Sequence, residues 1–148
     1  LQGMHANIVQ AETDISEGLP NFQLVGYLDS QVKEARERVR IALKNSGFKL
    51  PVKKITVNLS PADIRKEGTS FDLAIAISIL CSMNVISAKK IERSLLIGEL
   101  SLDGTIQNVK GILPIVFEAK KQGFSCCFVP KENEKEGKEI EVLRVLIL

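Results

Sequence analysis

Residues 55–73 read ITVNLSPADIRKEGTSFDL, and the fold depends on this stretch. Its first residues are β-branched and apolar, as is typical of a strand, which we expect over residues 53–59. A charged loop then leads through Gly68-Thr69-Ser70 to residues 71–83, which are almost all apolar and predict a helix. A helix that is apolar on nearly every side must be covered by other elements. Strand and helix therefore share the core of a mixed domain.

Two strands and one helix are predicted before this stretch. Apolar runs at residues 4–15 and 22–27, separated by turn residues 17–20, are expected to be paired strands. The best amphipathic pattern then predicts a helix from Asp29 or Ser30 to about Asn45, followed by Gly47 as its stop. These are residue types that favour the start and the end of a helix. Its apolar residues lie on one face: Val32, Ala35, Val39, Ala42 and Leu43.

After the apolar helix, the patterning predicts a hairpin, a helix and a strand. The hairpin has a two-residue loop, because both residues of Asp103-Gly104 tolerate positive φ. Pro114 fits the first turn of the helix. The hairpin is expected at residues 95–109, the helix from about Pro114 to Gly123, and the strand at residues 125–129. A highly charged surface segment follows at residues 131–141.

Helices inserted between strands predict an α/β fold, an α+β two-layer sandwich with helices packed on one sheet. The length of 148 residues suits a single domain, with 45% hydrophobic and 26% charged residues as in ordinary globular proteins. The chain starts without methionine and stops on an apolar run. We therefore expect residues 1–148 to be one domain excised from a longer protein. No apolar run is long enough to span a bilayer and no signal peptide is evident, which favours an intracellular protein.

The cysteine and histidine content argues against a redox or zinc site. Cys81, Cys126 and Cys127 form no CxxC motif and are expected to be buried, reduced thiols. His5 is the single histidine, so a zinc site has few ligands available.

Positive charge is concentrated in one part of the chain. Residues 31–66 hold ten Lys or Arg and three acids, a net charge of +7, although the whole chain carries only +2. Four of these cations fall on one stripe of the predicted helix: Lys33, Arg36, Arg40 and Lys44. Such a stripe suits a phosphate backbone or an acidic protein surface, or it is a solvated face partly neutralised by Glu34 and Glu37. No aromatic residue is interleaved with it, so any nucleic-acid contact would be to the backbone.

Ser70 has two interpretations at the level of the residues. As a nucleophile it needs a neighbouring base, and the nearest lysine, Lys66, belongs to a charged loop. As a helix cap it needs only free backbone amides, and Thr69 and Asp72 have the spacing of a capping box. We favour the cap. No P-loop, dinucleotide motif or Ser-His-Asp triad can be assembled from this sequence.

Five blocks of the chain resemble the N-terminal domain of the magnesium-chelatase-related AAA+ ATPases, the ComM or YifB family of bacteria. They span nearly the whole chain: residues 18–20, 36–40, 45–48, 55–73 and 98–104. That domain is similar to the proteolytic domain of Lon and to the C-terminal domain of RadA. The resemblance thus implies the fold called ribosomal protein S-five domain-two-like.

The resemblance to Lon also bears on catalysis. It places Gly68–Asp72 at the segment that carries Lon's serine nucleophile, with Ser70 in the nucleophile's place. Lon's catalytic lysine corresponds to Leu113, within Gly111-Ile112-Leu113. Because the lysine is replaced, the resemblance implies a non-catalytic domain with no catalytic residue of its own.

The family further implies a parent protein that is a homo-hexameric ring ATPase in the bacterial cytoplasm. ATP and magnesium would belong to an AAA+ module outside this chain, and ComM is associated with DNA branch migration in natural transformation. We expect no cofactor, metal, membrane or small-molecule site here. The expected partner surface, for DNA or neighbouring subunits, comprises the basic stripe and the 63–67 loop with Arg65 and Lys66. Alternatives are a residual serine peptidase using Ser70 and a purely structural interaction module.

Overall fold

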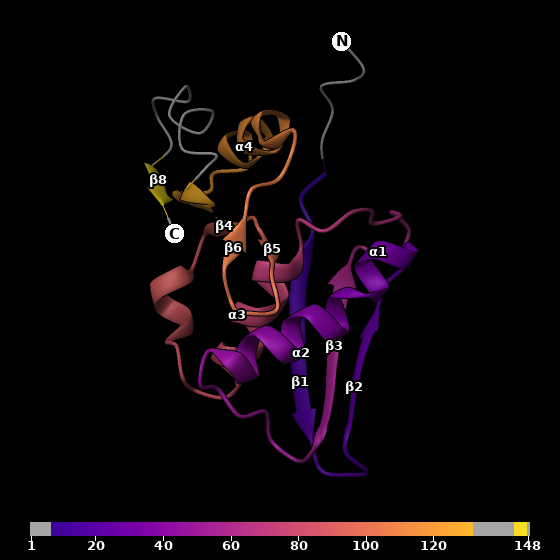
Figure 1. The fold of residues 1–148 in the computed structure, drawn as a ribbon. Coiled ribbons are helices and arrows are strands. Elements are labelled where there is room, and N and C mark those ends of the chain that lie inside the picture. Colours follow the sequence, from indigo (N-terminus) through magenta and orange to yellow (C-terminus); the bar gives the residue numbers. More distant parts are fainter. Residues whose placement is uncertain (1–6, 132–143, 148) are drawn as a thin grey trace.

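The first sheet contains three strands in the order β1-β3-β2 (Figure 1). This computed structural model describes residues 7–131 and the backbone of residues 144–147. The strands are β1 (Gln10–Ser16), β2 (Asn21–Val25) and β3 (Lys54–Ser60). β3 is antiparallel to β1 and parallel to β2.

The predicted pairing of the first two strands is therefore wrong, because β3 lies between them. The inward residues of β3, Ile55, Val57 and Leu59, are almost fully buried, as expected of a central strand. The four-residue link between β1 and β2 is long enough to cross two strand spacings of about 4.8 Å each. Strand propensity shows that β1 and β2 form, but not which strand lies beside which.

Three helices accompany this sheet: α1 (Ser30–Lys33), α2 (Ala35–Asn45) and α3 (Asp72–Ser82). The helix predicted up to Asn45 is confirmed, although it is interrupted at Glu34. α3 packs against β1 and α2, and its extent agrees with the predicted 71–83 helix. The larger core consists of buried side chains of these helices and of the sheet, together with Leu100 from a later segment: Phe22, Val32, Ala35, Val39, Ala42, Leu43, Ile55, Val57, Leu59, Ile75, Ala76, Ile79, Leu80 and Leu100.

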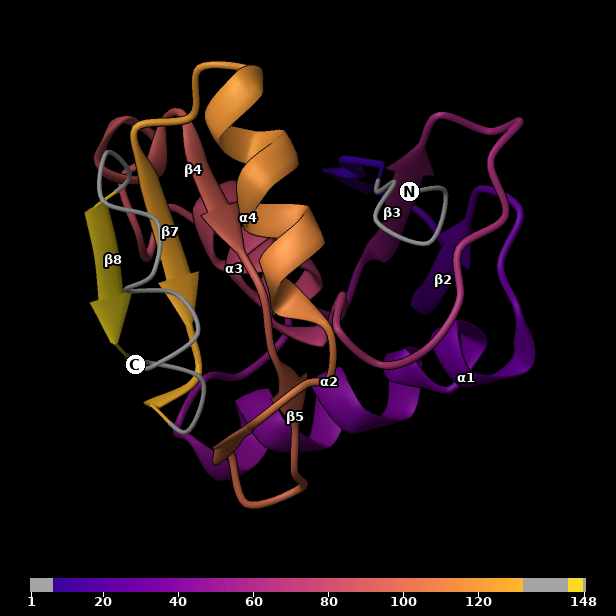
Figure 2. The same cartoon turned by 90° about the horizontal axis from the view of Figure 1, so that it is seen from above.

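A second unit of sheet and helix follows in the chain. After the 3-10 helix η2 (Ala88–Ile91), parallel strands are arranged in the order β4-β7-β8, and α4 lies along them (Figure 2). Their bounds are β4 (Ser94–Leu96), α4 (Ile112–Lys121), β7 (Cys126–Val129) and β8 (Arg144–Ile147). Val116 and Ala119 of α4 are buried in this second core together with Leu95 and Cys127. The helix and strand predicted near Pro114 and residue 125 are confirmed.

The predicted hairpin exists, but it is shorter than expected. β5 (Glu99–Leu100) pairs with β6 (Ile106–Gln107), whereas the start of the predicted strand forms β4 and pairs with β7. The turn is not the two-residue loop: the Gly104 amide donates to the Ser101 carbonyl over 2.9 Å, and Gly104 alone in this turn has positive φ, at 92°. Such a turn ends in a glycine bulge.

The fold class is confirmed as mixed α/β, but the single sheet that was expected is replaced by three small ones. The segment after β4 connects the two units: the Leu73 amide of α3 donates to the Gly98 carbonyl over 3.0 Å, and the Ile97 amide donates to the Phe128 carbonyl of β7 over 2.9 Å. Within the described part of the chain, no helix has the length and apolarity to cross a membrane. His5 and the charged segment from residue 132 onward lie outside the described residues.

Candidate functional site

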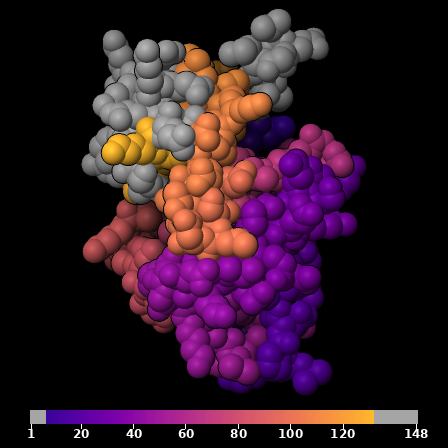
Figure 3. Space-filling model, in the orientation of Figure 1, coloured from indigo at the N-terminus to yellow at the C-terminus, as the bar shows by residue number. Residues whose placement is uncertain are grey.

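The basic stripe lies at the surface of α1 and α2. Asp29 begins α1 by accepting a hydrogen bond from the Val32 amide over 2.8 Å. The buried face of α2 points to the core, so its polar face is turned outward, and Figure 3 shows this helix as a purple band open to view. All four cations of the stripe are exposed: Lys33, Arg36, Arg40 and Lys44.

Only part of this charge is neutralised within the domain. Glu37 accepts a hydrogen bond from Arg40 over 2.6 Å and lies 3.8 Å from Arg36. The Arg40 hydrogen bond holds the pKa of Glu37 below its usual value. Among the described residues, no ion pair involves Lys33 or Lys44. The stripe therefore keeps a positive charge that its own acids do not cancel.

Lys66 does not belong to this surface, which corrects the expectation. Its side chain is only 1% exposed, and Nζ donates to the carbonyls of Gly26, at 2.5 Å, and Pro61. Burial lowers the pKa of Lys66. The Lys66 ammonium thus bonds to the Gly26 carbonyl, just after β2, and to the Pro61 carbonyl at the start of the loop, which also accepts from the Ile64 amide over 3.4 Å. Its neighbour Arg65 is exposed and pairs with Glu67.

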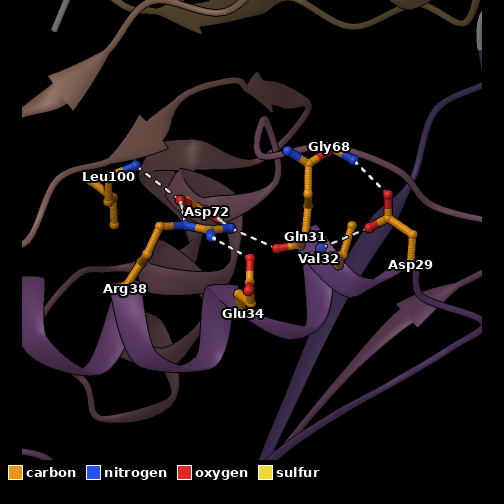
Figure 4. Close-up of polar contacts among 8 residues, drawn as sticks. All are labelled: Asp29, Gln31, Val32, Glu34, Arg38, Gly68, Asp72 and Leu100. Carbon is orange, nitrogen blue, oxygen red and sulfur yellow. Dashed lines mark hydrogen bonds and ion pairs between the residues drawn. The ribbon is translucent and has the colours of Figure 1, made fainter.

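Asp72 is also buried, and it bonds across the core instead of capping its own helix (Figure 4). Arg38 Nε donates to Oδ2 over 2.7 Å and Nη2 donates to Oδ1 over 3.0 Å. The Leu100 amide also donates to Oδ2, over 3.0 Å. Burial raises the pKa of Asp72, and the hydrogen bonds from Arg38 and Leu100 act against that rise. This carboxylate links α2, α3 and β5.

Ser70 is not a helix cap, contrary to the interpretation favoured from the sequence. α3 begins at Asp72 with Phe71 at the capping position and has no side-chain cap. Ser70 is half-buried and its carbonyl accepts a hydrogen bond from the Gly98 amide over 3.1 Å. The predicted capping box fails because the Asp72 carboxylate is engaged by Arg38 on another helix. Leu113 lies on α4 and packs against the second core.

A hollow that the sequence did not predict lies at the end of the basic stripe. It has a volume of about 520 Å³ and is lined by Arg40, Lys44, Gly47, Phe48, Lys49 and Leu50. Phe48 reaches it because the chain turns back at Gly47, whose φ is 91°, and the Phe48 amide donates to the Leu43 carbonyl over 2.9 Å. This is the six-to-one bond of a Schellman motif. The Gly47-Phe48 pair was the signal that could have predicted it.

The cysteines behave as structural thiols. Cys126 and Cys127 are buried and Cys81 is half-buried, and all three are free. Burial raises the pKa of Cys127 to about 12 and that of Cys81 above its usual value. Across the described residues, no three His, Cys, Asp or Glu side chains come together as metal ligands would.

Comparison with known proteins relates this geometry to a family. Residues 11–133 match the family described as subunit ChlI of Mg-chelatase. The chain is 45% identical to YifB of Escherichia coli over 134 residues and 42% identical to competence protein ComM of Haemophilus influenzae over 135 residues. These matches cover 90% and 91% of this chain but 26% of each relative. Lon protease of Chloroherpeton thalassium is 28% identical over 141 residues, 90% of this chain and 16% of that protein, consistent with a Lon-like fold.

Proposed function

Since the chain belongs to the family of subunit ChlI of Mg-chelatase, together with relatives such as YifB and ComM, we propose that it is a non-catalytic accessory domain whose α1–α2 face binds nucleic acid. The chain spans about a quarter of the length of these relatives, 26% of each. ATP hydrolysis, magnesium binding and assembly of a homo-hexameric ring in the cytoplasm are proposed for the parent protein.

The observation that carries this proposal is the set of four exposed cations along α1 and α2, of which Arg36 and Arg40 pair with Glu37. At a rise of 1.5 Å per residue, the eight steps from Arg36 to Lys44 on α2 cover about 12 Å, comparable to a few phosphates along a strand, and Lys33 extends the stripe onto α1. Each phosphate neutralised releases counterions, which makes such binding depend on salt.

Three side-chain positions support the absence of catalysis. Activating a serine requires a base in hydrogen-bond reach. The Lys66 ammonium is directed at the Gly26 and Pro61 carbonyls, and the position that resembles Lon's lysine is Leu113. Ser70 is also not among the residues that line the hollow beside Phe48. It does not line the larger hollow between β1 and β4 either, which has a volume of about 690 Å³.

The test is binding of single- and double-stranded DNA by fluorescence anisotropy at two salt concentrations. We expect affinity that falls as salt rises, and a shallower slope for the triple variant Lys33→Glu, Arg36→Glu, Arg40→Glu. The matched control is Lys120→Glu with Lys121→Glu, which reverses exposed cations at the end of α4. Absence of salt-dependent binding would remove this proposal, and so would an equal loss in both variants.

A second candidate function, contact with a neighbouring subunit, is favoured by a different surface. Leu19 is 87% exposed and Val52 is 75% exposed. They lie on two loops that Glu17 and Lys53 join by an ion pair of 3.3 Å. A contiguous exposed apolar patch marks a protein-binding surface, and we propose that these two residues contribute to one. If this surface assembles the ring, Leu19→Ser with Val52→Ser will lower the oligomeric state of the parent protein in sedimentation, whereas the basic-face variant will not.

A further inference from the structure

The hollow at the C-terminal end of α2 combines an apolar floor with a cationic rim. Phe48 and Leu50 supply apolar groups, and both are only partly buried and pack against the larger core. Arg40, Lys44 and Lys49 supply three positive charges, and no acid is among the lining residues. The occupant that fits this lining presents an apolar surface and negative charge close together.

The position of the hollow narrows the choice of occupant. Arg40 and Lys44 are shared between the hollow and the basic stripe, so a ligand that follows the stripe from Lys33 arrives there directly. Single-stranded nucleic acid repeats an anionic phosphate and a flat apolar base at every nucleotide. Its bases are unpaired and free to turn toward the protein, whereas those of a duplex are stacked inside it.

We propose that this hollow receives an unstacked base of single-stranded nucleic acid against Phe48, while Arg40, Lys44 and Lys49 contact the flanking phosphates. The inference rests on the proposed nucleic-acid function and refines it, because it makes the single strand the preferred form. Phe48 supplies the aromatic ring that the linear sequence of the stripe lacks. Recognition of this kind tolerates every base, since each has a π face.

The test separates base contact from phosphate contact by changing only the bases. A fluorescent deoxythymidine oligomer of about 12 nucleotides, within the range of sites known for single-strand binders, is compared with an oligomer of equal length that has abasic sites. Both carry the same phosphates. We expect the normal oligomer to bind the chain about 5- to 100-fold more tightly, as stacking of one base on an aromatic ring allows.

Phe48→Leu is the decisive variant, because leucine keeps the apolar packing and lacks the ring face. We expect it to reduce or abolish the preference for the normal oligomer. Phe117→Leu is the matched control, since Phe117 is an aromatic residue of α4 with 42% of its surface exposed and lies outside the hollow. It should keep the preference. Unfolding midpoints of both variants exclude a general loss of structure as the cause.

Each other result overturns the inference in a recognisable way. Equal, salt-dependent binding of normal and abasic oligomers would leave the proposed function standing and remove the base site. No binding of either oligomer at low salt would remove both. If Phe48→Leu weakens both oligomers alike, the ring does not contact a base. If an acidic peptide carrying one phenylalanine binds in a Phe48-dependent manner and the oligomers show no preference, the hollow is a protein-docking site.

Discussion

Arg38 on α2 and Asp72 at the start of α3 form a two-pronged ion pair, with N–O distances of 2.7 and 3.0 Å, across 34 residues of sequence. The Asp72 side chain is 1% exposed and that of Arg38 is 18% exposed. Arg38 also donates to the Gln31 carbonyl over 2.8 Å, which extends the contact to α1. This pair of side chains thus ties α2 to α3, and removing either partner would leave the other charge without its counter-charge.

Removing one partner of this pair should be costly. Arg38→Met leaves the Asp72 carboxylate buried without its cation, and we expect the free energy of unfolding at neutral pH to fall by about 3 kcal/mol or more in urea denaturation. Arg36→Met is the control: Arg36 is half exposed, so the change should stay within about 0.5 kcal/mol. The double variant Arg38→Met, Asp72→Leu should recover part of the loss. Equal effects of the two single variants would contradict the role of the pair.

The same variant should show a defined dependence on pH. Arg38 opposes the rise in the pKa of Asp72 that burial causes, so Arg38→Met should raise this pKa further. A carboxyl whose pKa is higher in the folded state binds its proton more tightly there, so stability is gained below the unfolded pKa and lost as pH rises through the folded value. The deficit of Arg38→Met should therefore shrink as pH falls toward about 4. A deficit independent of pH would contradict this assignment.

Substitution of Asp29 should destabilise the domain more than substitution of Ser70, because only Asp29 makes the side-chain hydrogen bonds of a helix cap. Its Oδ1 accepts from the Val32 amide and its Oδ2 accepts from the Gly68 amide over 3.3 Å. Asp29→Ala should lower the free energy of unfolding by about 1 to 2 kcal/mol. Ser70→Ala should change it by less than about 0.5 kcal/mol. An active-site serine probe should not label the chain, and labelling that disappears in Ser70→Ala would identify a peptidase.

Lys66 should contribute to the stability of the loop at residues 61–69 but not to nucleic-acid binding. Lys66→Met removes the side-chain donor to both carbonyls; Pro61 keeps the Ile64 amide, so the Gly26 carbonyl is the acceptor that loses its partner, and an unsatisfied buried acceptor costs about 1 to 3 kcal/mol. Amide hydrogen exchange of residues 61–69 should become faster, while the salt dependence of DNA binding stays unchanged. Arg65→Met, at the exposed neighbour, is the control for exchange. A changed salt slope with unchanged exchange would return Lys66 to the binding surface.

The cysteines should react in order of exposure. Cys81 is half-buried and should react with a maleimide first, whereas Cys126 and Cys127 should require unfolding. The folded Cys127 pKa of about 12 lies above its ordinary value of 9.0, so its contribution to stability is complete below pH 9.0 and is lost as pH rises toward 12. In that pH window, the free energy of unfolding of Cys127→Ala should depend less on pH than that of the parent chain. Identical slopes would show that Cys127 does not titrate as proposed.

Several elements could be predicted because their signals are local. Asp29 and Gly47 delimit the basic helix, and the apolar run after residue 71 and the segment after Pro114 both form helices. Capping bonds and helical periodicity involve residues a few positions apart, so neighbouring side chains are sufficient to determine them. The exposed positions of Lys33, Arg36, Arg40 and Lys44 follow from the same periodicity.

Contacts between distant segments could not be predicted in this way. The capping-box spacing of Thr69 and Asp72 was misleading because Arg38, from another helix, takes the Asp72 carboxylate. Lys66 looked like a surface charge because its acceptor, the Gly26 carbonyl, is 40 residues away. Phe48 is different, because the turn at Gly47 that folds it back beside Arg40 and Lys44 is a local signal.

The amino-acid sequence by itself determined which segments form the long helices, the mixed fold class and the family, all of which depend on short-range patterns or on residue identity. The tertiary structure alone decided that β3 separates β1 from β2, that Asp72 binds Arg38, and that Lys66 is buried. The physical reason is that sheet order and buried polar partners depend on which desolvated groups meet when elements pack. The stretch at residues 55–73 encodes a strand and a helix, but its Ser70 and Lys66 acquire their surroundings only from the folded chain.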